Sequence, residues 1–154
     1  MSNKFIMLML VTFLSIPLSG LAMTGMDHSG DNSAQAGTAK GSMIILGAEE
    51  VDGVKASAHL MDVKEEMAKH GMEMTHHIMV NFVEMTMSTS FEKGQVAIKV
   101  KDPAGNVSKA QKLMGMDGHF GVDLNLDQNG KYNFTIATKL PDGKKRTYHF
   151  EIEL

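Results

Sequence analysis

The 154-residue sequence contains no cysteine, and this absence excludes whole classes of site. Disulfide cross-links cannot form, although they are common in exported proteins. Blue-copper electron transfer requires a cysteine thiolate, and c-type haem attachment requires a C-x-x-C-H motif, so both are excluded. Any metal centre in this chain therefore uses ligands other than thiolate.

Recognisable catalytic and nucleotide-binding motifs are absent as well. The sequence has no G-x-S-x-G turn, no H-E-x-x-H helix, no P-loop and no G-x-G-x-x-G motif. The net charge is −3, and lysine and arginine form no stripe along the chain. These absences argue against an enzyme, and against nucleic acid or anionic lipid as a partner.

Residues 1–22 have the composition of a secretory signal. Lys4 precedes a short apolar run, Pro17 interrupts it, and a small-residue cleavage site follows at 20–22. Cleavage there gives an exported protein, periplasmic or secreted, with a net charge of −4. The alternative is an uncleaved membrane anchor, which the short, interrupted run disfavours. No later segment of the sequence is long and apolar enough to span a bilayer.

Two regions follow this leader. Residues 23–42 consist mostly of glycine, serine, alanine, asparagine and aspartate, with Met23, Met26 and His28 among them. This composition predicts a flexible linker. The remaining residues, 43–154, have the size of one domain.

Within that domain, six segments alternate apolar and polar residues with the period of two that is typical of half-buried strands. Turn-forming pairs such as Asp52-Gly53 and Asn129-Gly130 separate them. Seven or eight short antiparallel strands predict an all-β fold, an immunoglobulin-like sandwich. The expected interior comprises Val54, Leu60, Ile78, Val80, Phe82, Ile98, Val100, Val122, Leu124, Phe134, Ile136, Phe150 and Ile152.

One segment departs from this alternation. Asp62 is a suitable helix N-cap, Glu65 follows three residues later as in a capping box, and Gly71 is a suitable end. The sequence therefore predicts a short helix or helical loop near 62–70, between two strands.

Methionine is abundant where cysteine is absent. Twelve methionines follow the leader, and seven of them lie in the segments 69–79, 84–88 and 113–119, of which the first and the last also contain histidines. Leucine, isoleucine and valine specify a core better than flexible methionine does, so packing alone does not require this excess. Thioether and imidazole without thiolate form a ligand set suited to copper, especially Cu(I).

Strand alternation selects the candidate ligands. An inward Ile78 places His77 and Met79 on the opposite face, and an inward Phe120 places His119 outward. We expect the starts of these two strands to meet at one end of the sandwich, with methionines nearby. The alternative is that the methionines serve only in packing. The candidate metal ligands are His59, Met72, His76, His77, Met79, Met114, Met116 and His119.

Three phrases resemble known copper-handling sandwich proteins: LMGMDGHFGVDL at 113–124, NGKYNFTI at 129–136 and AHL at 58–60. On these phrases the domain resembles the YtkA-like family and the periplasmic accessory proteins of bacterial ferrous-iron uptake. The resemblance implies an exported immunoglobulin-like sandwich that binds copper. It also implies ligand roles for His59, His119 and either Met114 or Met116.

The leading functional hypothesis is an exported copper-binding protein that acts as a chaperone, buffer or sensor. Copper is its expected cofactor, as Cu(I) or Cu(II), with Cu(I) favoured. Its expected partners are the metal ion and a metal transporter or copper protein of the cell envelope. Two alternatives stay open: an accessory or docking module of a metal-transport system, and a structural domain with no metal site.

The linker prediction has a direct test. Because residues 23–42 contain no apolar face to lose, a chain that begins at Gly41 should melt within about a degree or two of the chain that begins at Met23. Thermal melting monitored by circular dichroism measures the difference. A large drop in melting temperature would show that the segment contributes to the fold.

Overall fold

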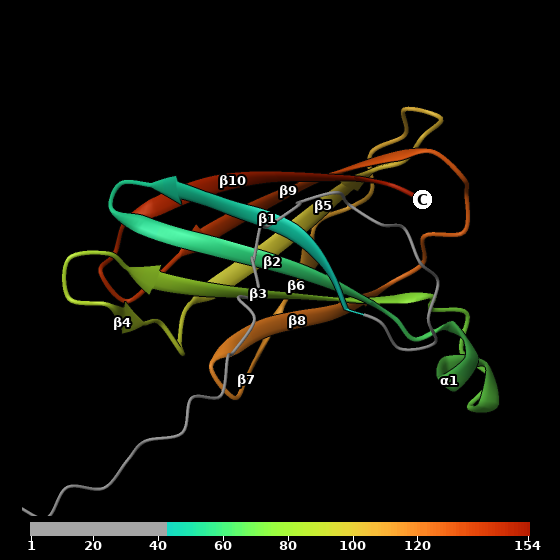
Figure 1. Ribbon diagram of the computed structural model, residues 1–154, viewed down its shortest axis with the longest axis horizontal. Helices are drawn as coiled ribbons and strands as arrows, with labels where there is room; N and C mark the ends of the chain where they lie inside the picture. Colours follow the sequence, from blue (N-terminus) through green and yellow to red (C-terminus); the bar gives the residue numbers. More distant parts are fainter. Residues whose placement is uncertain (1–42) are drawn as a thin grey trace, which may run out of the picture. The chain divides into compact units, whose positions relative to one another are not determined.

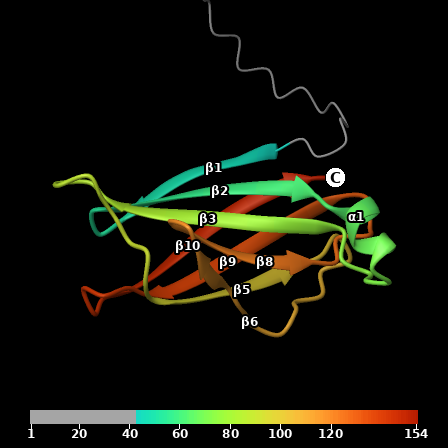
Figure 2. The ribbon, with the colours of Figure 1, turned by 90° about the horizontal axis from the view of Figure 1, so that it is seen from below.

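Residues 43–154 form a sandwich of two antiparallel β-sheets (Figures 1 and 2). The computed structural model describes these residues, so the predicted leader (1–22) and linker (23–42) lie outside the described part of the chain. The predicted all-β antiparallel sandwich is confirmed. Across 43–154, no helix has the length and apolar character needed to cross a membrane.

One sheet, sheet A, has the strand order β1-β2-β3-β8-β7, and the short β4 also pairs with β3. The other, sheet B, has the order β10-β9-β5-β6. Sheet A consists of β1 (Met43–Val51), β2 (Val54–Asp62), β3 (His76–Glu84), β4 (Thr89–Ser90), β7 (Met114–Met116) and β8 (His119–Leu124). Sheet B consists of β5 (Gln95–Lys101), β6 (Gln111–Lys112), β9 (Lys131–Lys139) and β10 (Lys145–Glu153).

Residues 43–154 contain seven long strands and three of two or three residues, β4, β6 and β7. The first long strand, β1, is not among the segments that alternate in the sequence. Its residues Ile44, Ile45 and Leu46 are consecutive apolar residues, and the register with β2 shifts between Ile45 and Gly47. This irregularity changes which residues face inward, so simple alternation is lost.

The predicted helix is present as α1 (Lys64–Lys69). It lacks the predicted capping box, because Val63 occupies the N-cap position and makes no side-chain cap hydrogen bond. The Asp62 carboxylate instead accepts a hydrogen bond from the Lys64 backbone N–H at 2.9 Å. The helix ends at Lys69, and Gly71 follows in the expected terminating position with a φ of 70°, which suits glycine.

The interior lies between the sheets and agrees closely with the predicted one. Val122 and Ile152 are half-buried against the core, and the other expected residues are buried. Phe82 of sheet A is central, because its ring packs against Phe120 at 5.7 Å and against Tyr148 of sheet B at 5.5 Å between centroids.

A buried arginine joins the two sheets at one end. Arg146 of β10 donates through Nη1 to Asp142 at 3.2 Å, and Nη2 donates to the same carboxylate. Its Nε donates to the Val51 carbonyl at 3.2 Å and Nη2 to the Asp52 carbonyl at 3.4 Å. The guanidinium hydrogen bond lowers the pKa of Asp142. The arginine thereby connects the β1–β2 turn with the β9–β10 turn.

Replacing Phe82 by alanine should lower the free energy of unfolding by about 3 kcal/mol or more, because the change leaves a cavity between the sheets. Chemical denaturation monitored by far-UV circular dichroism measures the loss. Met87, which is 76% exposed, provides the control, since Met87→Ala should change stability by about 0.5 kcal/mol or less. Similar losses in the two variants would contradict this account of the core.

Candidate metal-binding face

Histidine and methionine side chains gather on the outer face of sheet A, the face turned away from sheet B. Along each strand they alternate with buried residues such as Leu60, Ile78 and Phe120. Direct cross-strand partners share a face, so the pairing of β7 with β8 extends the assignment to β7. We call this group the His/Met face; its members are His59, Met61, His77, Met79, Met114, Met116 and His119.

A row of direct cross-strand partners crosses the His/Met face. His59 lies opposite Met79, and Met79 lies opposite Gly121. Gly121 in turn lies opposite Met114 on its other side. Such partners are about 4.5–5.5 Å apart at Cα. Because glycine has no side chain, the row has a gap at Gly121 with a methionine on either side.

The His77 ring fills part of this gap. A Cβ built on Gly121 would lie 2.6 Å from His77 Nε2 and 3.0 Å from its Cε1. The ring therefore lies over the glycine backbone, and Gly121 is buried although it belongs to the outer face. Nε2 therefore lies over the glycine that separates Met79 from Met114 in the row.

Asp123 holds the ring in this orientation. His77 Nδ1 is 2.6 Å from Asp123 Oδ1, and the two residues are direct partners across β3 and β8. An ionised carboxylate only accepts hydrogen bonds, so Nδ1 donates and the Nε2 of the neutral ring has a free lone pair. A carboxylate bonded to the distal nitrogen is a common arrangement of histidines that bind metals. The side chains of His77 and Asp123 are 19% and 37% exposed.

A tight turn brings the loop methionines to this site. Asp117 and Gly118 have φ values of 37° and 85°, and they connect the partners Met116 and His119. Aspartate followed by glycine suits a two-residue hairpin with positive φ at both positions. The turn folds β7 back along β8 and so places Met114 beside Gly121.

His119 lies on the same face but away from His77. The strands β3 and β8 are antiparallel, with His77 opposite Asp123 and Val80 opposite Phe120. The starts of the two strands therefore lie at opposite ends of their ladder. At about 3.3 Å per residue, His119 is more than 10 Å along the sheet from His77. The expectation that these strand starts meet at one end of the sandwich is wrong, because it requires parallel neighbours.

Two further candidates do not belong to the face. His76 is on the inner side of β3, where its Nδ1 lies 2.8 Å from Thr75 Oγ1, and burial lowers its pKa. Met72 lies in the loop between α1 and β3 and is 47% exposed. The structure thus brings together His59, His77, Met79 and Met114, places Met116 beside His119, and separates His76 and Met72 from both groups.

Carboxylates and imidazoles alone do not form a metal site in the described region. Within 43–154 there is no group of three or more histidine, cysteine, aspartate or glutamate residues arranged to hold an ion.

Comparison with known proteins supports the fold only. No family model matches the chain, and no curated protein matches it. The domain is similar to a DUF4426 family protein from Pseudomonas aeruginosa PAO1, with a TM-score of 0.54 and 14% identity over 70% of this chain and 92% of that one. The PmoD soluble domain from Methylocystis sp. (Rockwell) gives a TM-score of 0.42 and 11% identity over 69% and 94%.

The sandwich implied by the resemblance to YtkA-like proteins is therefore present, whereas no family model supports membership of that family.

Sequence reasoning missed two residues that shape the site, Asp123 and Gly121. Both share the outward face of β8 with His119, at spacings of two and four residues, and this signal is visible in HFGVD. What the sequence could not show is the pairing of β8 with β3, which sets Asp123 against His77.

Gly121→Ala tests the position of the ring. The new methyl group would meet His77 Nε2, so the ring should be displaced and its hydrogen bond to Asp123 weakened. Long-range ¹H–¹⁵N correlation spectra of the His77 ring should then lose the signature of a single Nδ1–H tautomer. Gly115→Ala is the matched control on β7, because its Cβ would meet neighbours only at 3.4 Å or beyond. An unchanged His77 spectrum in Gly121→Ala would contradict the geometry.

Proposed function

We propose that the protein is an exported copper-binding protein whose site is the centre of the His/Met face. The proposed ligands are His77 Nε2 and the sulfurs of Met79 and Met114, with His59 as a neighbouring fourth donor. The observation that supports this assignment is the His77 ring, which Asp123 fixes over Gly121 in the row between the two methionines.

The donor set favours Cu(I). Thioether sulfur is a soft ligand that selects Cu(I), and imidazole is compatible with both copper oxidation states. Zinc sites use thiolate, imidazole and carboxylate ligands. Among the described residues, histidines and carboxylates form no group of three, which disfavours such a site. Hard cations such as Mg²⁺ and Ca²⁺ require oxygen ligands.

The openness of the face suits exchange of the ion. Met114 is 58% exposed and Met116 is 43% exposed, and the row of ligands lies on a sheet surface rather than in a closed cavity. An ion held there stays accessible to a second protein. We therefore infer a role in buffering or delivering copper, with binding rather than catalysis as the activity.

Copper titration tests the proposal. Competition with bicinchoninate should show that the wild type binds Cu(I) tightly. His77→Ala should lower this affinity by at least about 100-fold. Asp123→Asn should lower it by about 10–100-fold, because that residue orients the ligand without touching the ion. Met79→Leu keeps the volume and removes the sulfur, so its loss of affinity measures the thioether. Bound copper should also raise the melting temperature of the wild type.

Two exposed residues outside the face provide matched controls. His149 lies on β10 of sheet B, and Met87 lies between β3 and β4. The substitutions His149→Ala and Met87→Leu should leave the affinity for Cu(I) unchanged. Absence of Cu(I) binding, or equal losses in His149→Ala and His77→Ala, would reject the site.

A further inference from the structure

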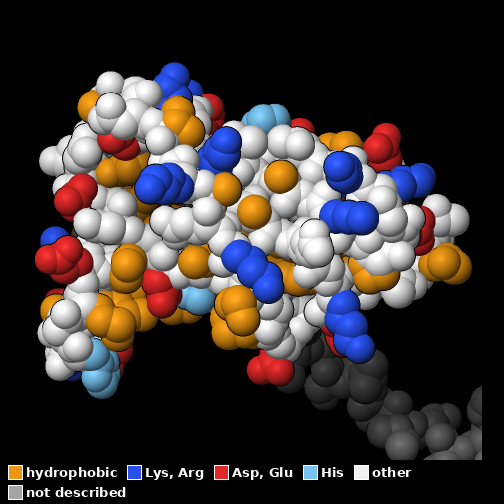
Figure 3. All heavy atoms as spheres, turned by 180° about the vertical axis from the view of Figure 1, so that it is seen from behind, with side chains coloured by type: hydrophobic (Ala, Val, Ile, Leu, Met, Phe, Trp, Pro, Cys, Tyr) orange, Lys and Arg blue, Asp and Glu red, His pale blue; other side chains and the backbone are white. Residues whose placement is uncertain are grey.

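The outer face of sheet B has a different chemistry, because lysines gather on it. The view in Figure 3, from behind, shows positive side chains spread over this side with small hydrophobic ones between them. They come from four strands, and the sequence places them far apart. We call them the lysine face; its members are Lys99, Lys101, Lys112, Lys139 and Lys145.

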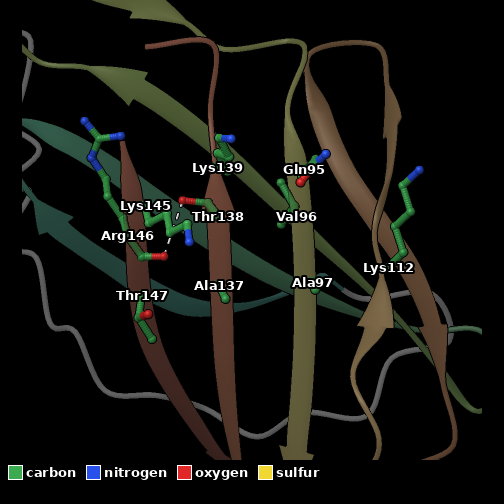
Figure 4. A pocket seen from close by; sticks show the side chains of 10 residues that line it. All are labelled: Gln95, Val96, Ala97, Lys112, Ala137, Thr138, Lys139, Lys145, Arg146 and Thr147. Carbon is green, nitrogen blue, oxygen red and sulfur yellow. Dashed lines mark hydrogen bonds between the residues drawn. The ribbon is translucent and has the colours of Figure 1, made fainter. Parts of the chain in front are cut away.

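Small side chains form a hollow at the centre of this face. Thr147 lies opposite Ala137, Ala137 lies opposite Ala97, and Ala97 lies opposite Lys112. The hollow has a volume of about 570 Å³ (Figure 4). Ala97 is half-buried and Ala137 is exposed, and their methyl groups give the hollow a shallow floor of small side chains.

The lysines around the hollow are not explained by stability. Lys139 and Lys145 are direct cross-strand partners, and like charges at such positions are destabilising. Neither forms an ion pair with any residue of 43–154, whereas Lys131, at the opposite end of β9, pairs with Glu151 at 2.8 Å. Protection of sheet edges can explain Lys145 and Lys112, but Lys99 and Lys139 are on the inner strands β5 and β9.

We propose that the lysine face is a docking surface for an extended acidic segment of a partner protein. Such a segment can lie along the row of small residues, between Lys139 and Lys145 on one side and Lys99 on the other. Neighbouring strands are about 4.8 Å apart, so the row offers a floor of small side chains roughly 10–15 Å long, with lysines on both sides. The His/Met face, on the other sheet, stays uncovered while this segment is bound.

A protein partner is favoured over a membrane or a nucleic acid, because the lysine face lacks exposed aromatic and large apolar side chains. The aromatic residues of β9 and β10 point inward and are buried, namely Tyr132, Phe134, Tyr148 and Phe150. Single-stranded nucleic acid needs exposed rings for stacking. Proteins that bind membrane surfaces use exposed aromatic and apolar residues as anchors. A hollow floored by alanine and threonine provides neither.

A labelled peptide tests this proposal on the chain that begins at Met23. Fluorescence anisotropy should show binding of a decapeptide of alternating aspartate and threonine, which weakens when sodium chloride is raised from about 20 to 200 mM. The counterpart with asparagine in place of aspartate should bind at least 10-fold more weakly. Lys112→Glu/Lys145→Glu should lower the affinity for the acidic peptide at least 10-fold.

Lys55→Glu/Lys64→Glu makes the same change of charge on β2 and α1 and is the matched control, with an expected change below twofold. Lys145→Glu should melt no lower than the wild type, because it removes the like-charge pair with Lys139. This result separates loss of docking from loss of folding.

The remaining outcomes overturn the proposal. These are no binding of the acidic peptide, or equal losses in the two double variants. Capture by phosphatidylglycerol vesicles that depends on the same lysines, without peptide binding, would assign the face to membranes instead. Self-association in low salt that Lys112→Glu/Lys145→Glu abolishes, measured by light scattering, would make the acidic occupant a second copy of this chain.

Discussion

The pairing of β3 with both of its neighbours is the constraint on which the rest of this structure depends. Its inward residues Ile78, Val80 and Phe82 are fully buried and fix which face of the strand meets the core. A shift of one residue would turn all three to solvent, so burial determines the register. That register in turn decides what lies beside His77 and Met79 on the other face. The core therefore orders the candidate site without contributing a ligand to it.

The candidate site depends on a glycine as much as on its proposed ligands. Any side chain at Gly121 would occupy the space of the His77 ring, and the ring then could not lie between the two methionines. Asp123 orients the ring through Nδ1 and leaves Nε2 available. The two outer faces of the sandwich thus have separate chemistries, with soft ligands on sheet A and lysines on sheet B. Under the two proposals, this separation lets one partner dock on sheet B while another exchanges copper on sheet A.

Much of the fold could be predicted from the sequence, because alternation along a strand is a local property. The inward Ile78 and Phe120 correctly assigned the outward faces of β3 and β8, and the Asp-Gly pairs marked turns. The short helix near 62–70 followed from its end signals, although its N-cap differs. Strand β1 was missed, since its irregular register with β2 removes the alternation.

Composition and strand alternation alone gave the side-chain chemistry of the candidate site: histidine and methionine without cysteine, with His77 and Met79 on one face. Which of the candidates are neighbours depends on how the strands pair in the folded domain. Antiparallel pairing moved His119 away from His77 and set Asp123 against it. The same kind of pairing gathered lysines from four strands into one surface, although the sequence shows no basic stripe. The physical reason is that a strand's faces follow from its own period of two, whereas the neighbours of a residue follow from non-local packing and register.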